Sequence, residues 1–298
     1  MTTGPKQGVY KKWTLIDAEL AEIRQLARIC QQHQPLDLRL NWDALALRGG
    51  DKANELLYYR DDVLIGFFSM DGLGFDEAEG TGMVHPSYRR QGVFRALVAV
   101  AREECRQNKT ESLLLLFDHR SDAAIAFANA IGAQHDFSEH SMRLDDPNRL
   151  PQIEQRLDFR KATQDDAPAI GAILAQDFNG DAAQIQQNVA HNMQSSVYQY
   201  YIARLDSQPV GTLNVQNLGG EAYIYGFVVR PEQRGCGYGK EILARAIADI
   251  VAQRPQPIFL EVETENDPAF GLYRSFGFEV TTTYDYYRLS VEQPKEIP

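Results

Sequence analysis

Features that mark several protein classes are scarce or missing in this sequence. There are three cysteines, Cys30, Cys105 and Cys236, and their odd number and wide spacing argue against a disulfide framework and for a reducing compartment. No apolar run approaches the length of a transmembrane helix. Positive charge is not in excess either, because the formal net charge is −11. We therefore expect no nucleic-acid partner and no membrane partner.

Other classes are disfavoured by missing motifs. The six histidines show no ligand spacing, so we predict no metal site. The first residues, MTTGPKQGVYKKW, lack the apolar core of a secretion signal, and we expect a cytoplasmic protein. What is present is typical of a globular chain: 44% hydrophobic and 24% charged residues, in a length of 298 residues that allows two domains.

The chain contains an internal repeat with one fixed offset. The difference of 145 in residue number recurs in the pairs Pro86 and Pro231, Arg89 and Arg234, Gly92 and Gly237, Ala124 and Ala269, Gly132 and Gly277, and Leu144 and Leu289. An ungapped offset over this distance indicates two copies of one α/β unit. We predict a first domain at 1–144, a linker at 145–156 with the sequence DDPNRLPQIEQR, and a second domain at 157–298.

Residues 234–240, RGCGYGK, form a glycine-rich turn between an apolar strand ending at Val229 and an amphipathic helix. Alternate glycines let the backbone approach a ligand closely, and the free N–H groups at a helix start attract anions. The turn therefore predicts a phosphate-bearing ligand. It is not a P-loop, because Lys240 is followed by Glu241, and the glycine spacing is not that of the dinucleotide fingerprint.

Together with residues 266–278, NDPAFGLYRSFGF, this turn resembles the acyl-CoA signature R/Q-x-x-G-x-G/A of the GCN5-related N-acetyltransferase (GNAT) family. The resemblance covers most of each half. It implies an α/β (α+β) chain of two tandem GNAT-like domains, each with a mixed, mostly antiparallel central sheet flanked by helices. The layout is similar to that of bacterial tandem enzymes such as mycothiol synthase, but a shared layout does not transfer a substrate.

The resemblance implies acetyl-CoA as cosubstrate and an N-acetyltransferase that acts on a primary amine of a small molecule by direct attack in a ternary complex. The backbone of the strand before the turn would hold the pantetheine arm as an added strand would. Arg234 shapes the turn or pairs with a phosphate, and Asn266 lies near the pantetheine, caps a helix, or does both. The implied cosubstrate-binding residues are Val228, Val229, Arg234, Gly235, Cys236, Gly237, Tyr238, Gly239, Lys240 and Asn266.

The reaction implied by the resemblance needs a proton donor and a base. Tyr273 matches the tyrosine that protonates the departing thiolate, and the alternative is a core aromatic on an amphipathic helix. A base must also take a proton from the amine. Glu221, Glu261 and Glu263 are candidates, and Glu263 is preferred because strand alternation turns it away from the face of Val262, near the end of its strand.

Two groups of tyrosines have two interpretations. Those at 198, 200 and 201 and those at 284, 286 and 287 either line an acceptor pocket, where rings suit an ammonium group, or pack within the sheets.

The first half departs from the family pattern. At the offset of 145, the third glycine becomes Phe94 and the tyrosine becomes Ala128, whereas Arg89 and Gly92 remain. We therefore expect a degenerate, catalytically silent first domain. An alternative for the whole chain is a non-catalytic acyl-CoA-binding or regulatory protein, and both a monomer and a homodimer are compatible with the sequence.

Overall fold

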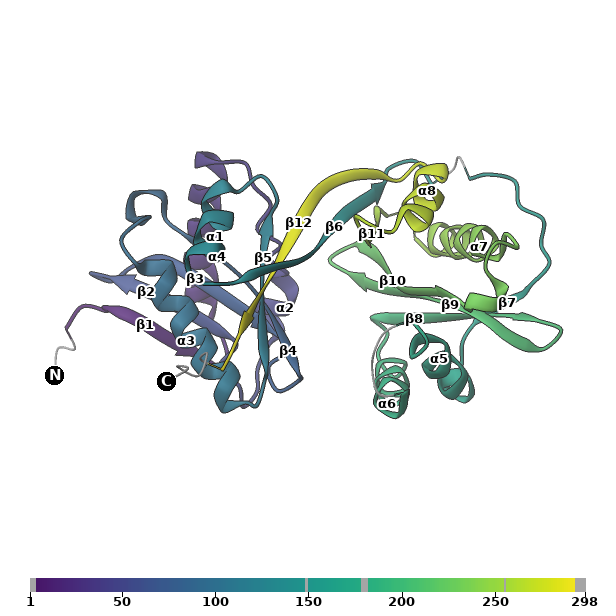
Figure 1. Cartoon of the computed structure of the whole chain (residues 1–298), viewed down its shortest axis with the longest axis horizontal. Coiled ribbons are helices and arrows are strands. Elements are labelled where there is room, and N and C mark those ends of the chain that lie inside the picture. Colours follow the sequence, from purple (N-terminus) through teal and green to yellow (C-terminus); the bar gives the residue numbers. More distant parts are fainter. Residues whose placement is uncertain (1–3, 148–149, 178–181, 255, 293–298) are drawn as a thin grey trace, which may run out of the picture. The chain divides into compact units, whose positions relative to one another are not determined.

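The structure, a computed structural model, describes residues 4–147, 150–177, 182–254 and 256–292. The chain packs into two compact units (Figure 1). Unit 1 contains Met1–Ser138 and Thr282–Pro298, and unit 2 contains Glu139–Thr281. Each unit has a central sheet with helices on both of its faces, which confirms the predicted fold class. None of the described helices is long and apolar enough to cross a membrane.

The sheet of unit 1 has the strand order β1-β2-β3-β4-β5-β12. All neighbouring strands are antiparallel except the parallel pair β4 and β5. The elements are β1 (Gly8–Lys12), α1 (Asp17–His33), α2 (Trp42–Leu47), β2 (Glu55–Arg60), β3 (Val63–Asp71), β4 (Glu77–Val84), α3 (Val93–Gln107), β5 (Ser112–Asp118), α4 (Asp122–Ala130) and β12 (Glu279–Ser290).

Unit 2 repeats this plan with the order β6-β11-β10-β9-β8-β7, in which β10 and β11 are the parallel pair. Its elements are β6 (Gln134–Leu144), β7 (Asp158–Lys161), α5 (Ala167–Leu174), α6 (Ala182–Asn192), β8 (Tyr198–Leu205), β9 (Gln208–Leu218), β10 (Glu221–Val229), α7 (Tyr238–Gln253), β11 (Ile258–Glu263) and α8 (Asp267–Ser275).

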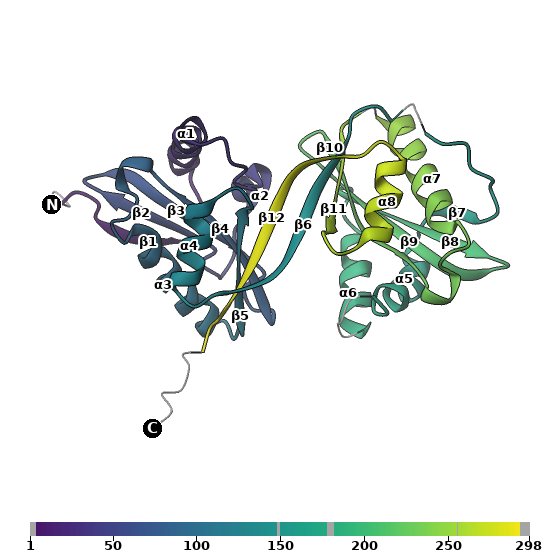
Figure 2. The same cartoon turned by 45° about the horizontal axis from the view of Figure 1, so that its top comes forward.

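The two units exchange their last strands, so the structure divides the chain differently from the domain limits at 144 and 157. Strand β6 follows α4 in the chain but pairs with β11 of unit 2, and β12 follows α8 but pairs with β5 of unit 1. Both strands therefore pass from one unit to the other (Figure 2). Each half of the sequence supplies the strand that completes the other half's sheet.

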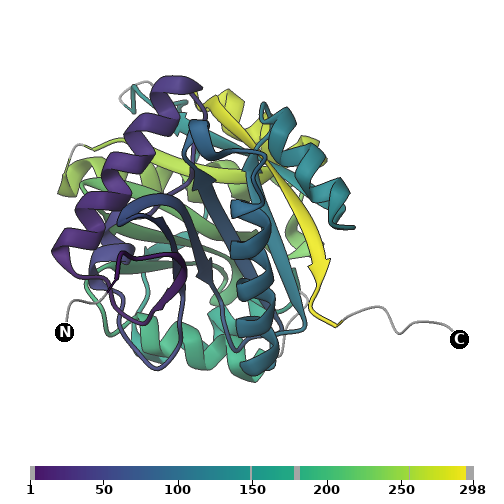
Figure 3. The ribbon, with the colours of Figure 1, turned by 90° about the vertical axis from the view of Figure 1, so that its left-hand side faces the viewer.

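In both units the helices cover opposite faces of the sheet. In unit 1, α1 packs on the face that carries Leu57, Phe67 and Met83, and α3 packs on the face of Leu56 and Phe68 (Figure 3). In unit 2, helices α7 and α8 share one core, whereas α5 and α6 share the other (Figure 1). The strand residues alternate between these cores because successive side chains point to opposite faces.

Local signals in the sequence account for several element ends. The turn between β2 and β3 has Asp61 and Asp62 at φ 50° and 65°, the left-handed pair that a two-residue hairpin needs. A capping box stands before α5, because the Thr163 backbone N–H donates to Asp166 at 2.9 Å. Strand β1 and helix α2 are short and weakly periodic, so the sequence carries little local signal for either.

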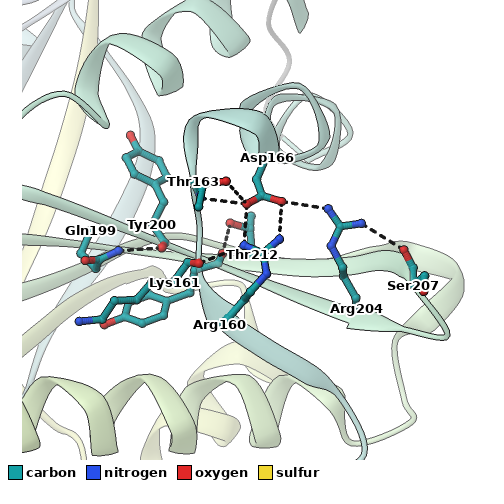
Figure 4. A network of polar contacts seen from close by, with 10 residues as sticks. Arg160, Lys161, Thr163, Asp166, Gln199, Tyr200, Arg204, Ser207 and Thr212 are labelled. Carbon is teal, nitrogen blue, oxygen red and sulfur yellow. Dashed lines mark hydrogen bonds and ion pairs between the residues drawn. The ribbon is translucent and has the colours of Figure 1, made fainter.

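The capping carboxylate also anchors two strands (Figure 4). Asp166 is buried and accepts hydrogen bonds from Arg160 of β7 at 2.7 and 2.9 Å and from Arg204 of β8 at 2.9 Å. These guanidinium groups and the backbone N–H of Thr163 hold the pKa of Asp166 far below its usual range, against the opposing effect of burial. The carboxylate therefore ties the start of α5 to the edge of the unit 2 sheet.

Replacing Asp166 by alanine is expected to lower the free energy of unfolding by about 2 to 4 kcal/mol at pH 7, because two guanidinium groups lose their buried partner. The lowered folded-state pKa means that this stabilisation is complete above the unfolded pKa of about 4 and is lost as the pH falls through the folded value. Urea unfolding of the wild type and of Asp166→Ala at pH 7 and pH 3 measures the difference in free energy of unfolding. A difference that does not shrink at the lower pH would contradict the ionic origin.

Candidate functional site

The sheet of unit 2 opens into a fork between β10 and β11. The two parallel strands are paired over Ala222–Ile224 and Ile258–Leu260. Strand β10 then continues to Val229 and β11 to Glu263, with no further pairing between them in the described residues. Both strands remain paired on their outer sides, so the inner edge of β10 keeps backbone groups free to bind an extended ligand.

A β-bulge bends β10 at the fork. The register with β9 shifts between Tyr225 and Val228, and Gly226 within this bulge has a φ of 52°. The buried amide of Asn214 on β9 donates to the Gly226 carbonyl at 3.5 Å and occupies the space where a side chain at 226 would lie. A glycine inside an apolar strand is the sequence signal for such a bulge, but this bulge was not predicted.

The glycine-rich turn follows β10 directly and leads into α7. Gly235 and Gly237 have φ of 77° and 86°, values that favour glycine, and Gly237 is the N-cap of the helix. Gly235, Cys236, Gly237 and Lys240 are exposed, whereas Tyr238 is buried beneath the turn. The structure thus presents the backbone of the turn and the free N–H groups of the helix start to solvent, as an anion site requires.

Arg234 braces the turn. Its Nε donates to the carbonyl of Val229 at 2.9 Å, and its guanidinium forms an ion pair with Asp177 at 2.6 Å. Of the two roles considered for this arginine, shaping the turn is the one that these contacts support.

Gly239 faces the fork from the first turn of α7. A Cβ at this position would lie 3.6 to 3.8 Å from Leu272, Phe227 and Val229, which is ordinary van der Waals contact. The backbone of α7 therefore comes close to both β10 and α8 here, and a longer side chain would extend into the space beside the fork.

Tyr273 lies on α8 beside the same fork. Its side chain is 7% exposed, and its ring lies 6.4 Å from that of Phe227 on β10 and 6.0 Å from that of Phe278. Among the described residues its hydroxyl has no hydrogen-bond partner. Burial raises the pKa of Tyr273 to about 12, so the phenol is protonated at neutral pH and is able to donate a proton.

Asn266 is the N-cap of α8, because its side-chain oxygen accepts a hydrogen bond from the Ala269 N–H at 3.2 Å. The capping role predicted as one possibility for this residue is therefore present. The cap fixes the start of the helix that carries Tyr273, immediately after β11.

Two of the three candidate bases lie beside the fork, and the third does not. Glu261 and Glu263 are exposed on one face of β11, opposite Val262, and both follow the last residue paired with β10. Glu221 instead begins β10, at the end where the two strands are paired, and it accepts a hydrogen bond from the hydroxyl of Tyr223. The fork therefore brings Glu261 and Glu263 together and leaves Glu221 apart.

The two groups of tyrosines belong to strands of different units. Tyr284, Tyr286 and Tyr287 belong to β12 and pair with β5 in unit 1. In unit 2, the Tyr201 hydroxyl donates to Asp249 of α7, on the face away from α5 and α6. Side-chain alternation thus separates Tyr201 from Tyr198 and Tyr200, which lie on the α5 and α6 face.

Tyr198 and Tyr200 of β8 lie on the α5 and α6 side of the sheet, as does Tyr225 of β10. Tyr225, which adjoins the bulge, donates its hydroxyl to Tyr200 at 3.1 Å, and Asn192 donates to the same oxygen at 3.3 Å. Tyr198 accepts from Gln216 at 3.3 Å. Neutral hydroxyl and amide groups therefore line this face of β10.

Unit 1 keeps the backbone of the turn. Arg90 and Gly92 have φ of 62° and 81°, close to the values of their unit 2 counterparts. Arg89 donates to the Val84 carbonyl at 3.3 Å, which repeats the brace described for Arg234. The repeated sequence thus produces the same turn, even where an arginine must adopt the left-handed conformation.

Side chains fill the corresponding space in unit 1. Phe94 of α3 packs edge to face with Phe68 and Phe127, with centroid distances of 5.7 and 4.9 Å, and its ring lies over Gly82 of β4. The tyrosine position is Ala128, which is fully buried. An aromatic cluster therefore occupies the side of β4 that corresponds to the α8 side of β10 in unit 2.

Comparisons with known proteins agree with this geometry. The model of the acetyltransferase (GNAT) family matches residues 18–133 and 166–278. Mycothiol acetyltransferase of Acidothermus cellulolyticus is 28% identical over 77% of this chain and 78% of its own, and N-alpha-acetyltransferase RimI of Mycobacterium tuberculosis is 33% identical over 43% of this chain and 82% of its own.

Solved structures show the same fold. A GCN5-related N-acetyltransferase from Sphaerobacter thermophilus superposes with a TM-score of 0.80 at 18% identity and covers 99% of each chain. A tandem GNAT protein from the clavulanic acid biosynthesis pathway has a TM-score of 0.74 at 17% identity, over 96% of this chain and 99% of its own. With the family model matching both halves, the chain belongs to the GNAT acetyltransferase family and is an acyltransferase with two tandem units.

Proposed function

We propose that unit 2 transfers the acetyl group of acetyl-CoA to a primary amine of a small molecule. The observation that carries this proposal is the fork between β10 and β11, with the glycine-rich turn at one end and Tyr273 beside it. Unit 1 lacks both the third glycine and the tyrosine, so the chemistry is assigned to unit 2.

The residues of unit 2 fit acetyl-CoA. Backbone N–H groups from Gly235 to Lys240 would bind the pyrophosphate, since the turn is exposed and Gly237 and Gly239 add no side chain. The edge of β10 at Val228 and Val229 that is not paired with β11 would hold the pantetheine amides as an added strand does. Asn266 lies where β11 passes into α8, next to this path.

The reaction follows from these positions. A neutral amine nitrogen attacks the thioester carbonyl, so that a C–N bond forms and the C–S bond breaks, while a base takes the surplus amine proton. The leaving thiolate takes a proton from the Tyr273 hydroxyl, which the raised pKa keeps protonated. The amine acceptor approaches from the α5 and α6 side, where Tyr225 and the exposed carboxylates of β11 offer hydroxyl acceptors and negative charge to a cationic amine.

Incubating the protein with acetyl-CoA and a panel of small amines tests the proposal, with release of the CoA thiol as the signal. We expect amine-dependent release by the wild-type chain. Tight acetyl-CoA binding without release for any amine would instead support the alternative of a non-catalytic acyl-CoA-binding protein.

Glu263→Gln is expected to lower turnover by about 100-fold at neutral pH if this carboxylate is the base, because the amine must lose a proton to attack. The defect should shrink at alkaline pH, where more of the amine is already neutral. Glu261→Gln is the matched control, since both residues are exposed on the same face of β11. A loss seen with Glu261→Gln alone would move the role to that residue, and full turnover in both would exclude a carboxylate of β11 as base.

A further inference from the structure

One side chain from the segment before β7 contacts the glycine-rich turn. Arg156, the last residue of the predicted linker, donates from Nη2 to the carbonyl of Cys236 at 2.5 Å. The same nitrogen lies 3.1 Å from the position of a Cβ at Gly237, so its guanidinium occupies the space that this glycine leaves open. Its planar group also lies over the ring of Tyr238, 4.9 Å from the centroid.

The charge of Arg156 is not neutralised by these contacts. In the described part of the chain its side chain contacts a carbonyl and a ring, and no carboxylate. The contact with Cys236 uses one of the five N–H donors that a guanidinium carries. Arg234, by contrast, is paired with Asp177 and bound to the strand end. Arg156 is therefore the arginine at the turn whose charge is available to an anion.

A buried glutamate holds Arg156 in this place. Glu241, in the first turn of α7, is 0% exposed, and its carboxylate accepts the backbone N–H of Arg156 at 3.0 Å and that of Leu157 at 2.9 Å. Arg245, one helical turn on, donates to the carbonyls of Leu157 and Phe159 at 2.7 and 3.1 Å. A buried carboxylate is costly unless it is well bonded, and here its bonds fix the backbone that carries Arg156.

This anchor occurs in the unit whose turn is complete. At the offset of 145, α3 of unit 1 carries Ala96 in place of Glu241 and Val100 in place of Arg245. Glu241 and Arg245 thus hold the backbone of Arg156 beside the turn in unit 2, and unit 1 has neither side chain at the matching positions.

We propose that Arg156 is a phosphate-binding residue of the cosubstrate site, which makes the end of the linker part of that site. Its guanidinium takes a phosphate group of acetyl-CoA, either the pyrophosphate at the turn or the 3′-phosphate of the nucleotide, since planar guanidinium groups bind phosphate oxygens with paired N–H donors. The inference rests on the proposed binding of acetyl-CoA to unit 2.

Calorimetric titration of the full chain tests it with three ligands: acetyl-CoA, its 3′-dephospho form, and S-acetylpantetheine, which has no phosphate. Arg156→Ala is expected to raise the Kd for acetyl-CoA by about 10- to 100-fold, the range for a lost charged hydrogen bond. Its Kd for S-acetylpantetheine should equal that of the wild type. If Arg156→Ala also raises the Kd for the 3′-dephospho ligand, Arg156 binds the pyrophosphate. If it does not, Arg156 binds the 3′-phosphate.

Two variants make the result specific. Arg156→Lys keeps the charge without the paired donors, so its Kd for acetyl-CoA should lie between those of the wild type and the alanine variant. Arg254→Ala removes an exposed arginine at the far end of α7 and should not change the Kd. Equal acetyl-CoA affinity in the wild type and Arg156→Ala would overturn this inference alone, whereas a wild type that binds no acetyl-CoA would overturn the proposed function with it.

Discussion

Replacing Tyr273 by phenylalanine is expected to lower turnover by about 10- to 10,000-fold while leaving acetyl-CoA affinity nearly unchanged. The ring that packs near Phe227 and Phe278 is retained, so the core of unit 2 keeps its volume. What is lost is a hydroxyl without a hydrogen-bond partner among the described residues, in a protonated state that its pKa of about 12 ensures. Steady-state kinetics under conditions where chemistry limits the rate measure the effect.

Tyr201→Phe is the matched control for this variant. Tyr201 is another buried tyrosine of unit 2, but its hydroxyl donates to Asp249 rather than facing the fork. We expect its removal to affect stability more than turnover. If Tyr273→Phe turns over as fast as the wild type, the hydroxyl is not the proton donor and Tyr273 is a packing residue.

Gly239→Glu is expected to raise the Kd for acetyl-CoA by at least about 100-fold, because a carboxylate would enter the space beside the fork and repel the phosphates. The fold should survive, since glutamate near the start of a helix is favourable and an added Cβ meets ordinary contacts. Gly271→Glu, on α8, adds the same charge where a Cβ has open space and serves as the control. Calorimetry on the three proteins gives the comparison.

The same titration reports on unit 1. We expect one acetyl-CoA per wild-type chain and no acetyl transfer by Gly239→Glu, because Phe94 and its aromatic neighbours fill the space beside β4 and Ala128 supplies no phenol. Two bound molecules per wild-type chain, together with continued transfer by the variant, would show that unit 1 is an active site.

The repeat and the turn were predictable because they depend on local sequence. Gly235 and Gly237 have φ of 77° and 86°, and Arg90 and Gly92 adopt nearly the same backbone in unit 1, at φ of 62° and 81°. The capping box at Thr163 and the hairpin at Asp61 and Asp62 are equally local. For the same reason, the candidate cosubstrate turn and Tyr273 were found from residue spacing and from resemblance to the family.

Only part of the fork could be predicted from the sequence. The strand ending at Val229 was predicted from its apolar run, but the bulge at Gly226 depends on Asn214, which lies in a different strand. The position of Arg156 depends on Glu241, which is 85 residues away in the chain. Such pairs leave no periodic signal, because they arise from packing between elements rather than within one.

The sequence by itself determined that the chain is a tandem repeat of one α/β unit, that its second turn is complete and that its first is not, since composition and spacing encode these directly. The tertiary structure alone decided which sheet each final strand completes. Strands β6 and β12 occupy matching positions in the repeat, so either sheet edge offers a similar partner, and pairing is settled by hydrogen bonding between β6 and β11 and between β12 and β5.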